Sequence, residues 1–415
     1  MISLAFLIAV ISGVAAQTPI SFSTIEPSLT AIQAAAATAP VGELTSHVEG
    51  AAFSRFIQIW LENTDYSEAV ADPSLQTLAK QGITFSNYWA STHPSEPNYI
   101  SVVGGDYFGM NGDNFERVPA NISTVVDLLE TKHISWAEYQ EDLPYAGFQG
   151  FNYSNQQTFA SDYVRKHNPL VIYDSIANNE TRLSNIKNFT SFANDVHSHR
   201  LPQWSFMTPN MTNDGHDTNV TIAGKWSLKF LQPLLSEEYF ADDTLVLLTF
   251  DENGTKAVGN RVFAILLGGA VPKHLHGTVD DTFYTHYSCI STVSQNWDLP
   301  SLGRNDVGAN VFQLVADATD FHNKAVNTTG FYANSSIPGY LNSQTWAPLP
   351  VPITTGNVLQ SVKDTWGNSA ETSPYNADSA VPYDGYGAQV ANSNPGTQLG
   401  PPDHEGHAKR AHDHV

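Results

Sequence analysis

Residues 83–109, ITFSNYWASTHPSEPNYISVVGGDYFG, are the stretch from which the fold can be inferred. The run 83–89 is apolar and aromatic, as in a buried strand, and the sequence from Pro97 onward is typical of a helix that stops at Gly104-Gly105. Between them lies THPSEPNY, with Ser95 at the junction. A serine placed there faces the unpaired N–H groups of a helix start, which suits a nucleophile directed at a phosphorus with negative oxygens. Pro-Ser-x-Pro is also ordinary turn chemistry, so the assignment depends on the rest of the chain.

Apolar runs of strand length alternate with helical patterns along the chain. This alternation predicts an α/β fold with a mostly parallel sheet that is covered by helices on both faces. In such folds the functional site lies beyond the carboxyl ends of the strands. The expected strands are 55–61, 83–89, 133–139, 203–208, 244–250 and 262–267, and the expected helices are 72–81, 123–131, 219–235, 285–297 and 306–316.

The ends of the chain differ in character from the middle. Residues 1–16 have the short apolar run and the Val-Ala-Ala cleavage pattern of a secretory signal peptide. Residues 17–52 are expected to be a loosely packed arm, and 53–340 a single catalytic domain. Residues 341–415, rich in Pro, Gly, Asn and Ser, are expected to be an extended wrap or a flexible tail. The tail histidines could bind a metal weakly, but a solvated polar tail is the favoured interpretation: His404, His407, His412 and His414.

Composition excludes several functional classes. The chain has 415 residues, with 19 basic and 41 acidic residues and a formal charge of −22. This charge opposes binding to nucleic acid or to an anionic membrane surface. No segment after the leader is long and apolar enough for stable insertion in a bilayer. A hydrophobic content of 41% indicates a folded, globular protein.

Sequons and cysteine content agree with export from the cell. Asn-x-Ser/Thr occurs nine times, and Asn210 and Asn253 are expected to stay unmodified because they adjoin the candidate chemistry. The single cysteine, Cys289, cannot form an internal disulfide and is expected to be buried and inert. The sequons expected to carry N-linked glycans are Asn121, Asn152, Asn179, Asn188, Asn219, Asn327 and Asn334.

Two acidic pairs directly follow expected strands. Glu62-Asn63 comes after 55–61, and Asp251-Glu252 comes after 244–250. Either pair alone is best interpreted as loop charge or a turn cap. Two such pairs at one edge of a sheet favour a site for a hard cation, because a cation offsets the repulsion between neighbouring carboxylates.

Two further segments could reach the same cleft. Residues 209–217 (PNMTNDGHD) follow another expected strand, and they could form a turn with a helix cap or could present Asp214 and His216 to the site. His286 stands at the start of an expected helix, where an imidazole can point into the crevice. A lone histidine is more often structural than catalytic.

Seven motifs in one order carry a resemblance to a known family. ENTDY, THPSEPNYISVVGGDYFG, WAEYQEDLP, RKHNPLVIY, NDGHD, LLTFDENG and THYS resemble the phosphoesterase family of secreted acid phosphatases and bacterial phospholipases C. The pattern is most similar to the fungal acid phosphatases and covers about residues 53–317. The resemblance implies an α/β/α sandwich of the alkaline-phosphatase-like type, followed here by an irregular C-terminal segment.

The resemblance also implies roles for individual residues. Ser95 stands at the nucleophile position, in a pattern similar to the Thr-x-Pro-Asn of nucleotide pyrophosphatases. Acidic ligands replace the histidine-rich sets of two-zinc enzymes, which implies one divalent metal ion. The implied metal ligands are Glu62, Asn63, Asp251 and Glu252. The implied catalytic histidines are His93, His216 and His286, and the expected substrate contacts are Asn98, Asp214, Asp217, Lys166 and His167.

The hypothesis that follows is a secreted acid phosphatase acting on small phosphate monoesters. A cation-activated Ser95 would form a phosphoserine, with His216 or His286 protonated in mildly acidic medium. One alternative is a phosphodiesterase or phospholipase C using the same core, although no lipid-binding module is recognisable. The remaining alternative is a non-catalytic secreted glycoprotein of the same fold.

Overall fold

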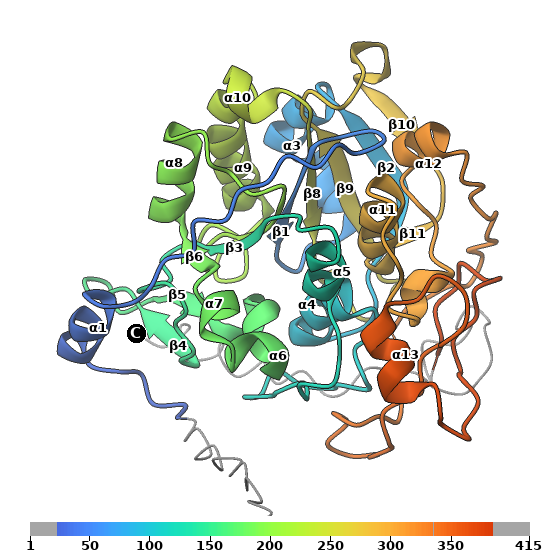
Figure 1. Cartoon of the computed structure of the whole chain (residues 1–415). Coiled ribbons are helices and arrows are strands. Elements are labelled where there is room, and N and C mark those ends of the chain that lie inside the picture. The colour runs from blue at the N-terminus through green and yellow to red at the C-terminus, as the bar shows by residue number, and fades with distance from the viewer. Residues whose placement is uncertain (1–22, 335, 385–415) are drawn as a thin grey trace, which may run out of the picture.

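Strand β1 (Arg55–Leu61) lies in the middle of a nine-stranded sheet, as shown by a computed structural model that describes residues 23–334 and 336–384 (Figure 1). The strand order is β10-β2-β9-β8-β1-β7-β3-β6, and β11 pairs with β2. A separate hairpin consists of β4 and β5. The other strands of the sheet are β2 (Ile83–Trp89), β3 (Trp136–Gln140), β6 (Ile186–Asn188), β7 (Trp204–Thr208), β8 (Thr244–Phe250), β9 (Arg261–Leu267), β10 (Thr278–Asp280) and β11 (Tyr284–Thr285), and the hairpin is β4 (Asn152–Ser154) and β5 (Ser161–Val164).

The sheet is parallel except at one strand. β1 pairs in parallel with both β7 and β8, whereas β9 is antiparallel to its neighbours β8 and β2. Every residue of β7 and β8 is buried, as expected of strands covered on both faces. The predicted mostly parallel sheet is therefore confirmed, with β9 as its reversed member.

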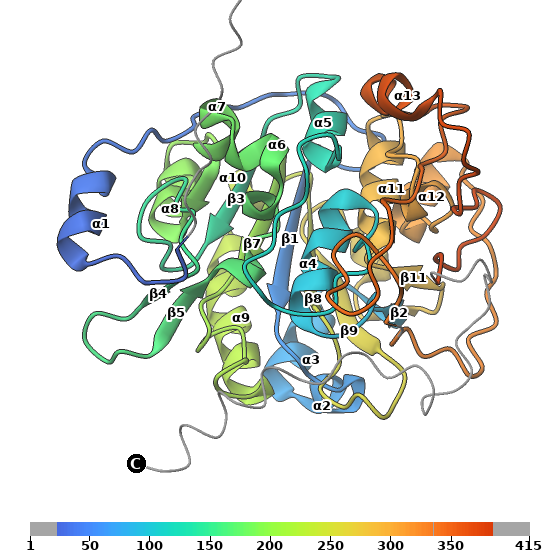
Figure 2. The same ribbon diagram turned by 90° about the horizontal axis from the view of Figure 1, so that it is seen from below.

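Helices cover both faces of the sheet (Figure 2). Helices α2, α3 and α9 lie on one side, and α5, α11 and α12 lie on the other. The predicted α/β fold with helices on both faces is thus confirmed. The helices are α1 (Leu29–Ala36), α2 (Tyr66–Ala71), α3 (Pro73–Ala79), α4 (Ser95–Gly104), α5 (Val125–Glu130), α6 (Asp174–Ala177), α7 (Glu180–Leu183), α8 (Phe189–His197), α9 (Val220–Leu234), α10 (Glu238–Ala241), α11 (Tyr287–Asn296), α12 (Gln313–Thr319) and α13 (Gln360–Trp366).

Helix α4 begins two residues earlier than the sequence suggests. Pro94 is its N-cap, Ser95 its first residue, and Pro97 its third. Proline is tolerated there because the first-turn N–H groups have no partner within the helix. The predicted glycine stop is confirmed, since Gly105 ends the helix with a φ of 75°.

The helix expected over 306–316 is wrong for most of its length. The structure has a short 3₁₀ turn at Asn305–Val307, and α12 begins only at Gln313. Between them the Asn310 side chain donates hydrogen bonds to the carbonyls of Phe283 and Lys324, at 2.9 and 2.8 Å. These distant partners hold Asn310 in an irregular segment that sequence periodicity does not reveal.

The N-terminal arm, from residue 23 onward, is attached more firmly than expected. Helix α1 buries Ile32, and the Glu26 carboxylate accepts hydrogen bonds from the backbone N–H and the hydroxyl of Ser154. Farther along, Ser46 Oγ and the Val48 N–H donate to Gln203 Oε1 at 2.6 and 2.8 Å. The arm therefore contributes to the packing around the start of β7.

The C-terminal segment to residue 384 is a wrap, one of the two forms expected. Val358 and Val362 are buried, and the backbone N–H of Leu359 donates to the Ser301 carbonyl at 2.9 Å. The Tyr375 hydroxyl donates to Asp106, just beyond the end of α4. The signal peptide at 1–16 and the tail histidines lie outside the described residues. Within the described residues, no helix has both the length and the apolar character needed to cross a membrane.

Glu138 on β3 makes stability dependent on pH. Its carboxylate is fully buried and accepts hydrogen bonds from the N–H of Leu170 and the amide of Gln140. Burial raises its pKa from 4.5 to about 8. Because the pKa is raised in the folded state, the protonated form favours folding, and stability is lost as pH rises from about 4.5 to about 8.

We therefore expect Glu138→Gln to flatten the pH dependence of the free energy of unfolding. In the parent, urea unfolding should show a loss on the order of 4 kcal/mol between pH 4.5 and pH 8 that is attributable to this group. The variant should lack most of that loss. If the free energy of unfolding fell equally with pH in both proteins, the attribution of this loss to Glu138 would be contradicted.

Candidate active site

The end of β1 lies beside the end of β8, and this register brings the two acidic pairs together. Leu61 is paired with Phe250, so Glu62 and Asp251 are the next residues at the same edge of the sheet. The Asp251 N–H donates to the Leu61 carbonyl at 2.9 Å. The Glu62 N–H donates to the Asp214 carbonyl, also at 2.9 Å, which adds the loop after β7 to the same edge.

Ser95 faces Glu62 from the first turn of α4. Both side chains are 0% exposed, and Ser95 Oγ donates to Glu62 Oε2 at 3.2 Å. Tyr99, one turn later on the helix, donates its hydroxyl to Glu62 Oε1 at 2.9 Å. The serine thus lies at a helix N-terminus and beside a carboxylate, the two features expected for a nucleophile that meets a phosphate.

Asn98 organises the loop that precedes Ser95. Its Oδ1 accepts the backbone N–H groups of Ser91 and Thr92, at 2.8 and 3.2 Å. Its Nδ2 donates to the carbonyls of Thr92 and Pro94, at 2.9 and 3.1 Å. These contacts with backbone groups give Asn98 a positioning role in the loop, and its contact with phosphate stays a prediction.

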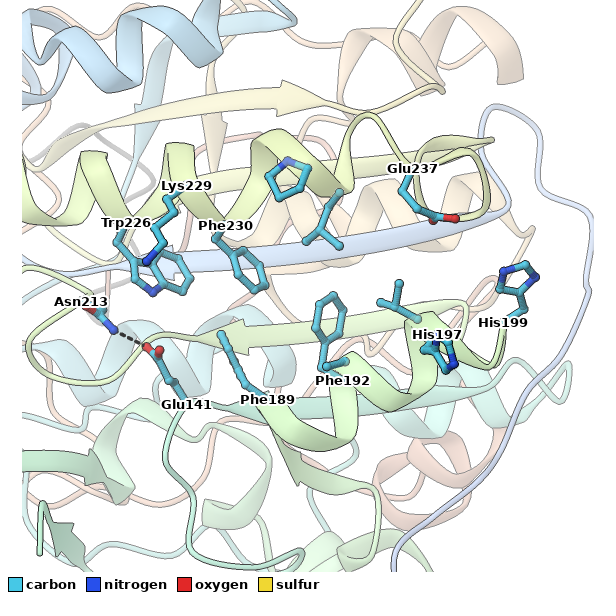
Figure 3. A pocket seen from close by; sticks show the side chains of 14 residues that line it. Glu141, Phe189, Phe192, His197, His199, Asn213, Trp226, Lys229, Phe230 and Glu237 are labelled. Carbon is cyan, nitrogen blue, oxygen red and sulfur yellow. Dashed lines mark hydrogen bonds between the residues drawn. The ribbon is translucent and has the colours of Figure 1, made fainter.

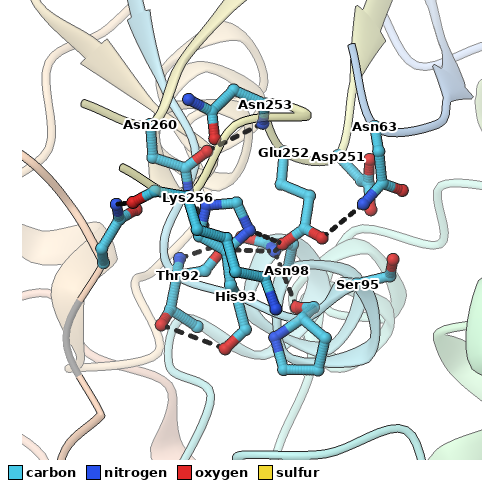
Figure 4. A network of polar contacts seen from close by, with 12 residues as sticks. Asn63, Thr92, His93, Ser95, Asn98, Asp251, Glu252, Asn253, Lys256 and Asn260 are labelled. Carbon is cyan, nitrogen blue, oxygen red and sulfur yellow. Dashed lines mark hydrogen bonds and ion pairs between the residues drawn. The ribbon is translucent and has the colours of Figure 1, made fainter. Parts of the chain in front are cut away.

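Glu252 is the centre of a second set of contacts (Figure 4). His93 Nδ1 lies 2.6 Å from its Oε2, and Asn63 Nδ2 donates to its Oε1 at 2.7 Å. Asn98 Nδ2 lies 3.3 Å from Oε2. Both carboxylate oxygens of Glu252 thus contact protein nitrogen atoms. Its role as a metal ligand stays a prediction, and so does direct contact of His93 with phosphate.

Asp251 differs from Glu252 in this respect. Its buried carboxylate interacts with the Glu62 carboxylate and the Ser95 hydroxyl, and Asn63 Oδ1 is buried without a hydrogen-bond partner. Asn63 and Asp251 lie next to one another at the edge of the network (Figure 4). Burial, followed by the nearby carboxylates of Glu62 and Glu252, raises the pKa of Asp251 well above its ordinary value.

These buried oxygens fit a hard divalent cation. Glu62, Asn63, Ser95 and Asp251 would offer only oxygen atoms, the ligands that Mg²⁺, Ca²⁺ and Mn²⁺ prefer. Across residues 23–334 and 336–384, no three His, Cys, Asp or Glu side chains are arranged to hold a metal. An amide and a hydroxyl oxygen would therefore have to complete the set.

His167 bridges two carboxylates. Its Nε2 lies 2.9 Å from Glu62 Oε1, its Nδ1 lies 3.3 Å from Asp214 Oδ2, and its ring stacks on Tyr99. Burial alone would lower its pKa, but the carboxylates outweigh burial and the pKa rises. For the Glu62 carboxylate the signs are opposite: burial would raise its pKa, but the neighbouring His167 lowers it to about 2. His167 and Asp214 therefore position Glu62.

Lys166 and His216 contact each other near Glu62. Lys166 Nζ lies 3.2 Å from His216 Nε2 and 3.4 Å from Asp113 Oδ2. His216 Nδ1 lies 2.8 Å from Asp217 Oδ1, so Asp217 orients the imidazole. Both Lys166 and His216 help to lower the pKa of Glu62, so they lie near its carboxylate.

His286 is held on both ring nitrogens. Its Nε2 lies 2.6 Å from the Asp251 carbonyl oxygen and its Nδ1 lies 3.2 Å from the Tyr88 hydroxyl. Burial lowers its pKa to about 3, so the imidazole is neutral in mildly acidic medium. The protonated form expected from the sequence is therefore disfavoured, and His286 supports the Asp251 backbone.

The sequence that forms this site is similar to a known protein family. Residues 48–300, more than half of the chain, match the family described as Phosphoesterase family. The chain belongs to the phosphoesterase family. The match includes all thirteen residues that the sequence assigns to the site, since these lie between Glu62 and His286.

The relatives of this phosphoesterase include several fungal proteins. One from Aspergillus fumigatus, named Acid phosphatase, is 54% identical over 392 residues, covering 92% of this chain and 87% of its own. One from Kluyveromyces lactis, named Probable acid phosphatase, is 58% identical over 83% of each chain. A Phosphate-repressible acid phosphatase from Penicillium chrysogenum is 50% identical, covering 91% of this chain and 92% of its own. Among solved structures, an alkaline phosphatase superfamily protein from Vibrio parahaemolyticus is 11% identical with a TM-score of 0.39, covering 63% of this chain and 73% of that one.

Sequence reasoning missed three residues of the phosphoesterase site. Tyr99 contacts Glu62 and lies four residues after Ser95, a helical spacing that could have indicated it. Asp113 accepts the Glu96 N–H at 2.9 Å and contacts Lys166. Lys256 follows the second acidic pair, and its side chain points back toward the network around Glu252 (Figure 4). No local pattern marks Asp113 or Lys256, because loops bring them to the site.

The sequons differ in accessibility. Asn253 is buried, and its Nδ2 donates to two backbone carbonyls, which agrees with the expectation that it stays unmodified. Asn334 is 2% exposed, and its Nδ2 donates to the carbonyls of Lys256 and Val258 at 2.9 and 3.1 Å. A glycan at Asn334 is incompatible with this structure, contrary to the expectation. Asn152, Asn188 and Asn210 are half-buried, and Asn121, Asn179, Asn219 and Asn327 are exposed.

We expect Asn98→Ala to destabilise this phosphoesterase by about 3 kcal/mol, because it leaves buried backbone groups around Thr92 without partners. Urea unfolding would measure the loss. Asn155→Ala serves as the control, because Asn155 makes comparable loop hydrogen bonds in an exposed hairpin. Equal, small effects of both substitutions would show that Asn98 does not organise the loop.

Proposed function

We propose that this protein is a secreted acid phosphatase that hydrolyses phosphate monoesters through Ser95. The observation that carries the proposal is the position of Ser95 Oγ at the first turn of α4, 3.2 Å from Glu62 Oε2. A hydroxyl in that place lies at the positive end of a helix dipole and beside a buried carboxylate. The fungal relatives named acid phosphatase support the same activity.

In the proposed reaction Ser95 Oγ attacks phosphorus in line with the leaving oxygen. A bond forms between Oγ and phosphorus, the bond from phosphorus to the alcohol oxygen breaks, and a phosphoserine remains. The hydroxyl proton passes to His216 Nε2, which gives a proton to the departing alcohol. Water then attacks the phosphoserine and gives a proton to the same nitrogen. That proton returns to Ser95 Oγ as inorganic phosphate is released.

Lys166 and His216 are proposed to bind the nonbridging oxygens. Lys166 Nζ donates to His216 Nε2 at 3.2 Å beside Glu62, so a phosphate oxygen that meets this ammonium would lie next to the imidazole. Asp217, 2.8 Å from His216 Nδ1, fixes the orientation of the ring. His216 Nε2 is also the nitrogen from which we expect the leaving alcohol to take its proton.

We propose Glu62, Asn63 and Asp251 as ligands of one divalent cation, with Ser95 Oγ completing the set. The clustering of the buried Glu62 and Asp251 carboxylates beside Ser95, together with the unpartnered Asn63 Oδ1, supports this assignment. A cation bound there would lower the pKa of the serine hydroxyl and reduce the charge on the phosphate oxygens. Glu252 keeps Asn63 and His93 in place through hydrogen bonds to both of its carboxylate oxygens.

Secretion is part of the proposal. The leader over residues 1–16 and four exposed sequons support it. The acidic surface suits a medium in which some carboxylates are protonated, because self-repulsion is then reduced.

Ser95→Ala should abolish hydrolysis of p-nitrophenyl phosphate, with kcat falling by about 10⁴-fold or more, because no other hydroxyl occupies that position. Ser101→Ala is the matched control, a second buried serine of α4 whose hydroxyl contacts Ser91 and the Asn98 carbonyl. It should keep most of the activity. Near-normal turnover by the Ser95 variant would refute the nucleophile assignment.

Asp251→Asn should weaken binding of a divalent metal, because it removes a negative charge from the proposed ligand set. Elemental analysis of dialysed protein should find less metal in this variant than in the parent. Asp317→Asn, which alters an exposed carboxylate on α12, should retain the parental content. Unchanged metal content in the Asp251 variant would count against the ligand set.

A further inference from the structure

An apolar groove lies between helices α8 and α9, apart from the residues around Ser95. Its volume is about 720 Å³, which is within the range of sites that hold small organic ligands. Aromatic and aliphatic side chains line its middle, and polar groups stand at its two ends (Figure 3). Open apolar surfaces of this kind usually have an occupant.

Flat aromatic rings form the wall of the groove. Trp226 and Phe230 on α9 stack with centroids 4.8 Å apart and planes inclined by 10°. Phe189 on α8 stacks on Phe230 at 5.4 Å. The faces of such rings carry partial negative charge, which attracts the C–H groups on the flat side of a sugar ring. The groove therefore resembles a carbohydrate platform in its chemistry.

A sequon stands at the start of the helix that carries this wall. Asn219, in Asn219-Val220-Thr221, is exposed and is the N-cap of α9. Its Oδ1 accepts the backbone N–H groups of Thr221 and Ile222, at 3.0 and 3.3 Å. N-linked glycosylation substitutes Nδ2 and leaves Oδ1 in place, so the cap and a glycan are compatible.

The sequon stands at the end of α9 that is nearer to Trp226. Trp226 and Phe230 lie one turn apart on one face of α9, and Asn219 caps the start of this helix seven residues before Trp226. Seven residues of helix span about 10 Å along the axis, a length comparable to about two linked sugar rings. The first rings of a glycan on Asn219 can therefore reach Trp226.

We propose that the N-linked glycan of Asn219 lies along this groove, with the apolar faces of its first N-acetylglucosamine rings on Trp226 and Phe230. At the near end of the groove Asn213 Nδ2 donates to Glu141 Oε2 at 2.9 Å, so amide and carboxylate groups stand where sugar hydroxyls would need partners (Figure 3). An amphipathic sugar chain matches this combination better than a wholly apolar ligand. The inference rests on passage through the secretory pathway and does not depend on the chemistry of Ser95.

The first test compares two glycans on the folded protein produced in a secreting eukaryotic host. Native protein is treated with an endoglycosidase that cuts between the first two N-acetylglucosamine rings, and glycopeptides are quantified by mass spectrometry over time. The glycan on Asn219 should be released at least about tenfold more slowly than the glycan on Asn327, an exposed sequon away from the groove. After denaturation the two should be released at similar rates. An unoccupied Asn219, or equal release from the native protein, would overturn the proposal.

Variants test the contact with the aromatic wall. Trp226→Leu should raise the rate of release from Asn219 to that of Asn327. Thr221→Ala removes the sequon but retains the Asn219 cap, and it should lower the thermal midpoint and increase binding of an apolar dye. Thr329→Ala, which removes the Asn327 sequon, should do neither. If Thr221→Ala, like Thr329→Ala, changes neither the thermal midpoint nor the binding of the dye, the glycan does not occupy the groove. Catalytic activity should be unaffected by Thr221→Ala, which separates this result from any failure of the proposed reaction.

Discussion

Burial of negative charge at the ends of two paired strands is the constraint on which the site depends. Parallel pairing of β1 with β8 places Glu62 beside Asp251, and backbone hydrogen bonding adds Asp214 from the loop after β7. Carboxylates removed from water need compensation. For Glu62 and Asp214 it comes from His167, which contacts both. Asp251 lies near the carboxylates of Glu62 and Glu252, and together with burial these raise its pKa well above the ordinary value.

The parts of this site that the sequence predicts are those that depend on strand ends. Short polar motifs directly after apolar strands identify Glu62, Asp214 and Asp251, because parallel strands end at one edge of a sheet. Ser95 follows from the same logic, since it joins a strand to a helix. The predicted strands 83–89 and 244–250 agree with β2 and β8 because long, apolar, β-branched runs have few alternatives.

The features that sequence reasoning does not reveal depend on partners distant in the chain. Asn98 and His286 have the residue types of substrate contacts, and only the folded chain shows that each also contacts backbone carbonyls. The reversed direction of β9 is likewise fixed by its pairing with β2 and β8, since its own apolar run gives no direction. The segment around Asn310 fails as a helix for the same reason. Local sequence patterns identify candidate residues, and contacts with residues distant in the chain determine their structural roles.

The docked C-terminal wrap implies that the region matched by the family and the unit that folds have different boundaries. The family match ends at residue 300, yet Val358 and Val362 are buried against the body and Tyr375 donates to Asp106 behind α4. A protease cut near residue 340 that released the wrap would expose the apolar surface against which Val358 and Val362 pack. It would also remove the Tyr375 hydroxyl that donates to the buried Asp106 carboxylate. Shortened forms of this enzyme are therefore expected to lose solubility before they lose any residue of the site itself.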